Sequence, residues 1–399
     1  MQILIVTASL PYPPASGGAI RVFGILSGLH EAGHTITLLS FGNPDADYAP
    51  LRDLCQQVHV FPPPERSTRE RVLTLLTTQQ ADIETRFYDD AFAQKLLTLM
   101  SEHEFDLVQF EAIESASYLP LVREQFPHMP ICFDTFNAEA DLQRMICQID
   151  RQDLSRLPHA FYSWIQSRRI AQYEGMLCRM ADLVIAVSPE DHALLSQYRA
   201  DERTTILHSG IFVKDYAEAQ TDIHYEQPTL IFTGKMDYRP NVDAMLWFAD
   251  HILPSVPEAQ LVIVGQKPHP RIQHLTERPN IQLTGWVDRI PPYLHAGDVY
   301  VAPLRMGSGT RLKILEAMAS SCAIVATSIA VSGLSDRTKD ALVIADDEAD
   351  FAEAIRQLLA NPQHRQALGE QAREAVAQHY DWSVLIPQLL TAYQEVGIG

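Results

Sequence analysis

The sequence predicts an α/β protein built from two doubly wound domains in tandem, and two observations carry this prediction. Short apolar runs alternate with segments of helical period along the chain, which is typical of parallel strands covered by helices on both faces. A polar stretch that contains Gly210 and Pro228 separates these runs into two sets. The first set comprises residues 3–9, 36–41, 58–61, 107–111, 131–136 and 183–188, and the second comprises 229–234, 260–265, 281–285, 299–304, 323–327 and 341–345.

We expect an N-terminal domain over residues 1–204 and a C-terminal domain over residues 205–375. A helix over residues 376–399 could pack back on the N-terminal domain. A chain of 399 residues with 46% hydrophobic content can bury two cores of this size. Because open parallel sheets bind ligands beyond the carboxyl ends of their strands, two such domains that face each other would form a cleft between them.

The composition limits the classes of partner. A formal net charge of -19 argues against nucleic acid, because neutralising phosphates takes a basic face, whereas a small anion needs only a local basic pocket. The five cysteines are scattered without metal-ligand spacing, as is typical of reduced core thiols. The apolar run at the N-terminus is too short to span a membrane and lacks a preceding basic region. We therefore expect a cytoplasmic protein without a bound metal.

The strongest functional signal is the pattern strand, glycine-rich loop, helix and strand over residues 299–327. Gly307 and Gly309 allow a sharp turn, and the free amides at the start of the following helix would face an anion such as a diphosphate. Lys313 adds positive charge, and Glu316 lies three residues later on a neighbouring part of the same helix face. Its carboxylate could accept both hydroxyls of a ribose. The alternative is a tight turn followed by a surface ion pair.

These residues resemble the retaining glycosyltransferases of family 4, which have the GT-B fold of two facing Rossmann-like domains. The resemblance covers nearly the whole chain. In that family two glutamates separated by seven residues mark the donor site, and the second matches Glu316, which implies a contact with the donor ribose. The first falls on Ser308, and the run GTRLKILEAMA is similar to a glycine-rich branch of the family.

The resemblance extends to other parts of the donor domain. In LIFTGKMDYRPNVDAMLWF, where many relatives hold the diphosphate with an arginine and a lysine, this chain has Lys235 and Asn241. A solvated loop lysine is the alternative for Lys235. Segments around Gly265 and Gly285 resemble the wall that contacts the nucleobase and the sugar.

The N-terminal domain supplies candidates for the cleft or the acceptor site. Gly17 and Gly18 follow the first strand, and the resemblance implies that their loop approaches the donor phosphates and the acceptor. In ICFDTFNAEAD the reaction-centre histidine of relatives is replaced by Phe136. The remaining candidates are Asp134, Asn137 and Glu139. A flexible turn and a helix-capping loop are the alternatives for these two segments.

The resemblance implies transfer of a sugar from a nucleotide-diphosphate sugar, a UDP- or GDP-sugar, to an acceptor hydroxyl with retention of configuration and without a metal or other cofactor. The acceptor would be a glycan, a lipid-linked glycan or a small molecule. The expected catalytic residues are Lys313, Lys235 and Glu316. The expected donor-binding residues are Gly307, Ser308, Gly309, Thr310, Arg311, Gly234, Gly265 and Gly285.

Two other functions fit the same pattern. A sugar-nucleotide epimerase of this fold would bind the same donor, and a non-catalytic sugar-nucleotide-binding protein would explain the departures at Ser308 and Phe136. Separately, the aromatic and basic stretch over residues 161–180 could lie on acidic lipid at the inner face of a membrane. Such an apolar face more often packs on a core, and we favour the core for it.

Overall fold

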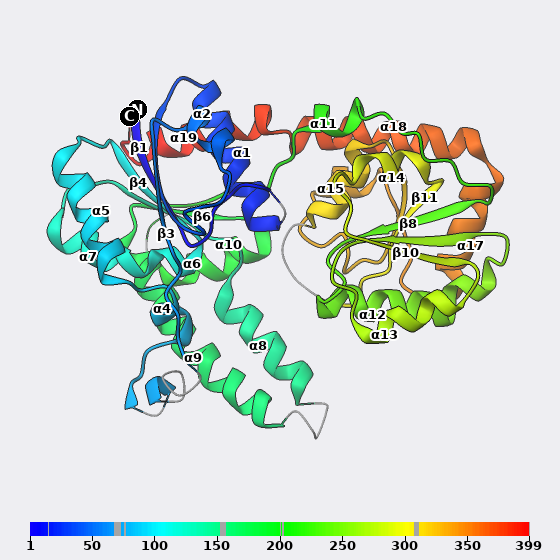
Figure 1. Ribbon diagram of the computed structural model, residues 1–399, viewed down its shortest axis with the longest axis horizontal. Helices are drawn as coiled ribbons and strands as arrows, with labels where there is room; N and C mark the ends of the chain where they lie inside the picture. The colour runs from blue at the N-terminus through cyan, green and yellow to red at the C-terminus, as the bar shows by residue number, and fades with distance from the viewer. Residues whose placement is uncertain are drawn as a thin grey trace. The chain divides into compact units, whose positions relative to one another are not determined.

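The computed structural model describes residues 1–14, 16–67, 73–75, 77–151, 157–199, 201, 203–306 and 311–398. It contains two compact units, one made of Met1–His208 with Leu385–Gly399 and the other of Ser209–Val384. Each unit has its own parallel sheet with helices on both faces (Figure 1). The predicted fold class of two doubly wound α/β domains is therefore confirmed.

The N-terminal unit has a seven-stranded sheet in the order β3-β2-β1-β4-β5-β6-β7. The strands are β1 (Gln2–Thr7), β2 (Thr35–Phe41), β3 (Gln57–Phe61), β4 (Leu107–Glu111), β5 (Ile131–Asp134), β6 (Leu183–Ala186) and β7 (Thr204–Ile206). All neighbouring strands are parallel. The three-residue strand β7 was not predicted, because its sequence Thr-Thr-Ile gives no apolar run. The order reverses between β1 and β4, so the loops after these strands flank a natural ligand-binding position.

Helices cover both faces of this sheet. One face carries α1 (Gly17–Glu31), α2 (Ala49–Leu54) and α19 (Trp382–Glu395), as Figure 1 shows. The connections after β3 form α4 (Asp82–Arg86), α5 (Asp90–Glu102), α6 (Ala112–Ser115), α7 (Leu119–Gln125), α8 (Glu139–Asp150), α9 (Leu157–Met180) and α10 (Pro189–Leu195).

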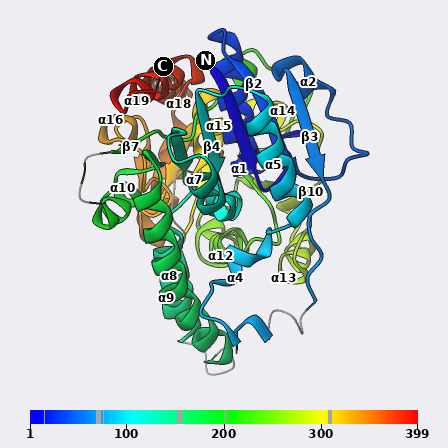
Figure 2. The same ribbon diagram turned by 90° about the vertical axis from the view of Figure 1, so that its left-hand side faces the viewer.

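Helices α8 and α9 form a pair that extends away from the sheet, which Figures 1 and 2 both show. The C-terminal part of α9 reaches the core of the unit, where Ile170, Tyr173 and Leu177 are buried. At about 1.5 Å per residue, its 24 residues span roughly 36 Å. The outer part of this helix therefore lies beyond the sheet.

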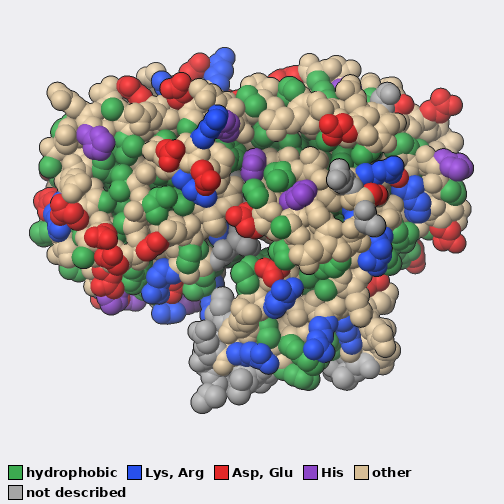
Figure 3. All heavy atoms as spheres, turned by 180° about the vertical axis from the view of Figure 1, so that it is seen from behind, with side chains coloured by type: hydrophobic (Ala, Val, Ile, Leu, Met, Phe, Trp, Pro, Cys, Tyr) green, Lys and Arg blue, Asp and Glu red, His purple; other side chains and the backbone are tan. Residues whose placement is uncertain are grey.

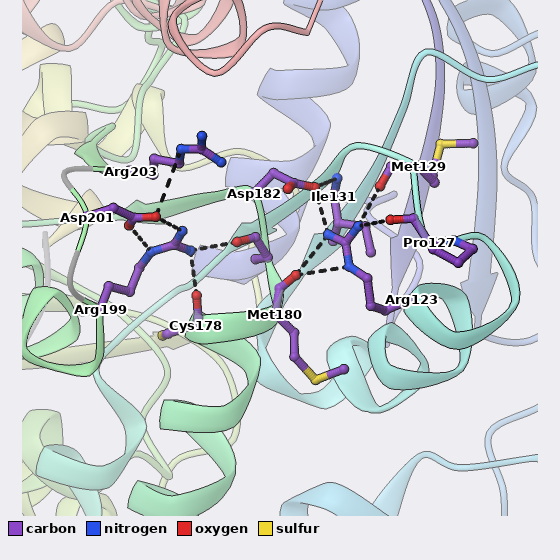
Figure 4. A network of polar contacts seen from close by, with 11 residues as sticks. Arg123, Pro127, Met129, Ile131, Cys178, Met180, Asp182, Arg199, Asp201 and Arg203 are labelled. Atoms are coloured by element: carbon purple, nitrogen blue, oxygen red, sulfur yellow. Dashed lines mark hydrogen bonds and ion pairs between the residues drawn. The ribbon is translucent and has the colours of Figure 1, made fainter.

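Two arginines hold the base of α9 on the domain (Figure 4). Arg123 donates hydrogen bonds to the carbonyl of Met180 at 2.8 and 3.2 Å and pairs with Asp182 at 2.7 Å. Arg199 donates to the carbonyls of Cys178 and Ala181. Because the last carbonyls of a helix lack partners within the helix, these guanidinium groups satisfy them and fix the end of α9.

The C-terminal unit has a six-stranded parallel sheet in the order β10-β9-β8-β11-β12-β13. Its strands are β8 (Thr229–Thr233), β9 (Gln260–Val264), β10 (Ile281–Gly285), β11 (Val299–Ala302), β12 (Ala323–Ala326) and β13 (Val343–Ile344). The helices are α11 (Val213–Ala217), α12 (Arg239–Trp247), α13 (Pro270–Gln273), α14 (Pro291–Ala296), α15 (Leu312–Ala319), α16 (Asp336–Lys339), α17 (Glu348–Ala360) and α18 (Pro362–His379).

The strand order of this sheet reverses between β8 and β11. Helices α12 and α13 cover one face, and α14, α15 and α18 cover the other (Figure 1). The segments that follow β8 and β11 therefore begin at the same edge of the sheet, on the two sides of the reversal, where open α/β sheets bind their ligands.

Candidate functional site

The site in the C-terminal unit begins with the turn after β8. Gly234 has a φ of +148°, which a residue with a side chain rarely adopts. A Cβ on Gly234 would lie 2.7 Å from the Nζ of Lys313, and a Cβ on Gly265 would lie 1.7 Å from the carbonyl oxygen of Gly234. Both glycines are therefore required for backbone and lysine to approach each other closely. Gly285 also has a positive φ, of +72°, and a Cβ there would meet open space.

Asn241 orients the amine of Lys313. The Nδ2 of Asn241 donates to the carbonyl of Lys235 at 2.9 Å, so its Oδ1 faces the Nζ of Lys313 and accepts a hydrogen bond at 2.6 Å. The same Nζ lies 4.3 Å from the centroid of the Phe232 ring. Asn241, which the sequence presents as a replacement for a cation, holds another cation in place in the structure.

The amine of Lys313 lacks a carboxylate partner within the described parts of the chain. Burial and the neighbouring Arg311 together lower its pKa to about 7, and the charge of Glu316 opposes this shift only in part. A lysine in this state gains from a nearby negative charge. Since Lys313 lies in the first turn of α15, the amides of that turn favour the same kind of ligand.

Glu316 lies one helical turn beyond Lys313 and is 7% exposed. Its Oε1 accepts a hydrogen bond of 2.9 Å from the hydroxyl of Tyr216 on α11. Burial raises the pKa of Glu316, while the Tyr216 hydrogen bond and the charge of Lys313 lower it. Tyr216 could not be predicted from the sequence, because it lies 100 residues away from Glu316 in the polar stretch between the two sets of strands.

The remaining predicted donor residues are Lys235, Arg311 and the glycine-rich loop. The side chain of Lys235 is 53% exposed, and its Nζ lies 3.7 Å from the carboxylate of Asp237. Arg311 precedes α15 as its N-cap residue and is half-buried. The predicted loop residues Gly307, Ser308, Gly309 and Thr310 lie outside the described residues.

In the N-terminal unit, Asp134 belongs to a buried ion pair. Its two carboxylate oxygens accept hydrogen bonds from Arg21 at 2.8 and 3.1 Å, and Arg21 also donates to the carbonyl of Leu207 at 3.0 Å. The side chains of Arg21 and Asp134 are 1% and 0% exposed. An acceptor could reach Asp134 only if this ion pair opened.

Glu111 extends this buried cluster toward the C-terminal helix. Its Oε1 accepts a hydrogen bond of 2.6 Å from Gln109, whose own Oε1 accepts a hydrogen bond from the Tyr393 hydroxyl on α19. Burial, with the charge of Asp134 as a second cause, raises the pKa of Glu111 well above its ordinary value. Neither Glu111 nor Tyr393 could be predicted from the sequence, because Glu111 ends an apolar strand and Tyr393 lies in an ordinary helical segment.

Asn137 and Glu139 lie together at the start of α8. The Nδ2 of Asn137 donates to Glu139 at 3.2 Å, and the backbone amide of Glu139 donates to Glu174 at 2.7 Å. Burial, followed by the charge of Glu114, raises the pKa of Glu139 to about 7. Burial also raises the pKa of Glu174 to about 7. These carboxyl groups can therefore hold or release a proton near neutral pH.

The predicted glycine pair opens α1. Gly17 is exposed, and the N-cap Ser16 accepts a hydrogen bond from Ala19 at 3.3 Å. A Cβ on Gly18 would lie 2.7 Å from the ring of Phe136. Phe136 thus packs against a residue without a side chain.

Two kinds of feature are absent from the described residues. No helix in the described ranges is both long and apolar enough to cross a bilayer. Nor do three or more His, Cys, Asp or Glu side chains within those ranges gather as they would around a metal ion.

The fold is shared with solved structures that align over the full chain. Sucrose-phosphate synthase from Thermosynechococcus elongatus superposes with a TM-score of 0.73 at 18% identity and covers 99% of both chains. The Anabaena protein HepE, crystallised in complex with UDP, superposes with a TM-score of 0.68 at 15% identity and covers 99% of this chain and 100% of its own. Together with the two parallel sheets, these matches define a protein of the GT-B class.

Family models identify the chain more closely. The model described as Glycosyltransferase Family 4 matches residues 15–214, and the model described as Glycosyl transferases group 1 matches residues 227–361. The chain belongs to glycosyltransferase family 4, as its motifs predicted. Phosphatidyl-myo-inositol mannosyltransferase from Mycolicibacterium smegmatis is 27% identical over 197 residues, which cover 47% of this chain and 51% of the relative. The chain thus matches about half the length of that relative.

Proposed function

We propose that this protein transfers a sugar from a nucleotide-diphosphate sugar to an acceptor hydroxyl with retention of configuration at the anomeric carbon. One observation carries the proposal. At the reversal point of the C-terminal sheet, Lys313 has a pKa lowered to about 7 and finds only an amide oxygen as its hydrogen-bond partner within the described residues. The diphosphate of the donor would supply the missing negative charge.

The proposed reaction places Lys313 on the leaving group. The bond between the anomeric carbon and the terminal phosphate oxygen breaks, and a bond forms between that carbon and the acceptor oxygen. The acceptor proton passes to the departing phosphate oxygen on the same face of the sugar, which needs no protein base and gives retention. Lys313, already held by Asn241, stabilises the developing charge without reorganising.

Glu316 would bind the donor ribose. Its carboxylate is fixed by Tyr216, so it can accept hydrogen bonds from two neighbouring hydroxyls with little loss of side-chain freedom. Gly234 and Gly265 would keep the turn after β8 packed against Lys313, and the solvated Lys235 would add longer-range attraction to the donor. The loop residues 307–310 and Arg311 remain proposed diphosphate contacts.

The acceptor would bind in the N-terminal unit near Asn137 and Glu139. With a pKa of about 7, Glu139 can accept or donate a hydrogen bond to an acceptor hydroxyl at neutral pH. The names of two similar proteins support a hydroxyl-bearing acceptor and a nucleotide-diphosphate donor: the mannosyltransferase acts on phosphatidyl-myo-inositol, and HepE was crystallised with UDP.

A donor screen followed by product analysis tests this function. We expect UDP or GDP to raise the melting temperature of the protein, and the matching nucleotide sugar to yield a glycosylated product by mass spectrometry when mixed acceptors are present. Nucleotide binding with an isomerised sugar nucleotide as the product would instead identify an epimerase. Binding without turnover on any acceptor would identify a non-catalytic sugar-nucleotide-binding protein.

A further inference from the structure

The outer part of α9 presents an exposed aromatic and basic face. Phe161, Trp164, Arg168 and Gln172 are spaced by three or four residues, so they share one side of the helix. The side chain of Phe161 is 63% exposed and that of Trp164 is 37% exposed. We call these four residues the α9 outer face. Apolar side chains that gather in one exposed patch can mark an interaction surface.

The side chains of the α9 outer face are ordered by contacts with one another. The Phe161 and Trp164 rings stack with centroids 6.0 Å apart, and the guanidinium carbon of Arg168 lies 4.1 Å from the centroid of the Trp164 ring. Within the described ranges no carboxylate pairs with Arg168. This guanidinium is therefore available to an anion while its position is already fixed by the indole.

The segment made of residues 73–75 and 77–80 lies beside α9 and widens this surface. Arg169 donates to the carbonyls of Leu75 and Gln80 at 3.0 and 3.1 Å and so holds this segment against α9. A groove of about 200 Å³ lies between them, with Trp164 and Arg168 among its lining residues. Leu73, in the same segment, is 60% exposed. The groove thus joins apolar and cationic groups on one side of the extension.

The outer part of α9 differs in charge from the chain as a whole. Residues 157–173 contain two arginines and no acidic residue, a net charge of +2, whereas the whole chain has -19 and residues 139–180, which span α8 and α9, contain six arginines and five acidic residues. Figure 3 shows basic and apolar side chains next to each other on the extension formed by α8 and α9. An anionic surface would repel most of this protein and attract this part of it.

We propose that the α9 outer face docks on a membrane surface rich in anionic phospholipid. Tryptophan and phenylalanine favour the boundary between head groups and acyl chains, and arginine pairs with lipid phosphates. A basic group near such a surface contributes to binding in a manner that salt screens. The arginine contacts at the base of α9 would transmit this attachment to the N-terminal domain (Figure 4).

The two ends of α9 lie in different environments in this proposal. The C-terminal part of α9 packs in the core through Ile170, Tyr173 and Leu177, as we favoured for the whole stretch. The outer part leaves Phe161 largely exposed and Trp164 partly exposed, and it carries no acidic residue between Phe161 and Tyr173. A protein partner would equally bury the rings, but a partner that matches unpaired arginine must itself be acidic, and the lipid phosphate is the simplest such group.

Vesicle flotation of the full chain tests the proposal. We expect the protein to float with vesicles of phosphatidylcholine containing about one third phosphatidylglycerol, to bind pure phosphatidylcholine at least about fivefold more weakly, and to dissociate at about 1 M salt. Arg168→Glu should reduce binding about tenfold, since it reverses one charge at the surface. Phe161→Ser combined with Trp164→Ser should reduce it at least as much.

Matched variants elsewhere control for charge and hydrophobicity. Arg373→Glu reverses an exposed charge on α18, and Ile344→Ser removes an apolar side chain that is 42% exposed on β13. Both should float like the wild type, and the circular dichroism spectra of all variants should agree. The proposal fails if the wild type does not float with anionic vesicles or if the α9 variants bind them normally. It also fails if light scattering shows that the α9 variants break an oligomer, which would assign the face to a second copy of the chain.

Discussion

Each unit withdraws a positive charge from solvent, fully at Arg21 and partly at Lys313, but the two charges are neutralised in different ways. In the N-terminal unit, Arg21 forms a two-pronged ion pair with Asp134 inside the core. In the C-terminal unit, Lys313 is held only by the amide oxygen of Asn241 and the ring of Phe232 among the described residues. Arg21 is thus paired with a carboxylate, whereas Lys313 has no carboxylate paired with it among the described residues.

This difference is the one expected between an ion pair that stabilises a fold, such as Arg21 with Asp134, and a lysine that binds a ligand, such as Lys313. A buried ion pair whose partners are both present resists removal of either one, because the remaining charge would be left without solvent or counter-ion. A buried lysine with a lowered pKa has the opposite property, since the folded protein is less stable with its charge than without it. Anion binding would remove that cost, so the lysine couples stability to the ligand.

The largest expected effect is a loss of stability when the Arg21–Asp134 ion pair is broken. Arg21→Met should destabilise the N-terminal unit by about 3–5 kcal/mol, because Asp134 would be buried as an unpaired carboxylate. Urea unfolding followed by circular dichroism measures this loss. The double variant Arg21→Met with Asp134→Leu should recover much of it, since neither charge remains. Equal losses in the single and double variants would show that packing, and not charge, makes this cluster important.

Replacing Lys313 should change the activity rather than lower the stability. Lys313→Met should lower the transfer rate about 100- to 1,000-fold, as expected when one preorganised group is removed from a developing anion. Its melting temperature without nucleotide should equal or exceed that of the wild type, because the desolvated charge is gone. Lys235→Met is the matched control and should have a much smaller effect, as its side chain is 53% exposed. A near-normal rate for Lys313→Met would refute the assignment of this lysine to the leaving group.

The ribose contact should be next in size. Glu316→Gln should weaken binding of the nucleoside diphosphate about tenfold or more, because hydrogen bonds to a charged acceptor contribute roughly 1.5–3 kcal/mol. Tyr216→Phe should weaken it only severalfold, since the carboxylate remains and loses its orientation alone. Calorimetric titration with UDP and GDP measures both effects. Unchanged affinity of the Glu316→Gln variant would exclude the ribose role.

The smallest effect, taken over a single pH unit, is a pH dependence of stability. The pKa of Lys313 falls from 10.5 to about 7 on folding. Above pH 7 the unfolded chain holds a proton that the folded chain releases, so stability should rise with pH until about 10.5, by up to about 1.4 kcal/mol per pH unit. Comparing urea unfolding of the wild type and Lys313→Met between pH 7 and about 9 isolates this contribution. Identical slopes in the two proteins would contradict it.

Sequence patterns predicted the fold well, because strands buried on both faces produce continuous apolar runs. They singled out Lys313 and Glu316 as candidate site residues from a local motif, in which spacing along one helix is enough. They could not identify Tyr216, whose contact with Glu316 depends on how α11 packs against the unit. They also could not separate the two ends of α9, since the same residue types serve the buried and the exposed part of that helix.

The return of the last helix to the N-terminal unit has a consequence for biosynthesis. Residues 385–398 supply Ile386, against which Gly28 of α1 packs, and Tyr393, which closes the cluster around Gln109. The unit that is translated first therefore cannot complete its own core until the second unit has been synthesised. During elongation its unfinished side would be exposed to chaperones, and truncation before residue 385 should impair the opposite end of the polypeptide rather than the neighbouring one.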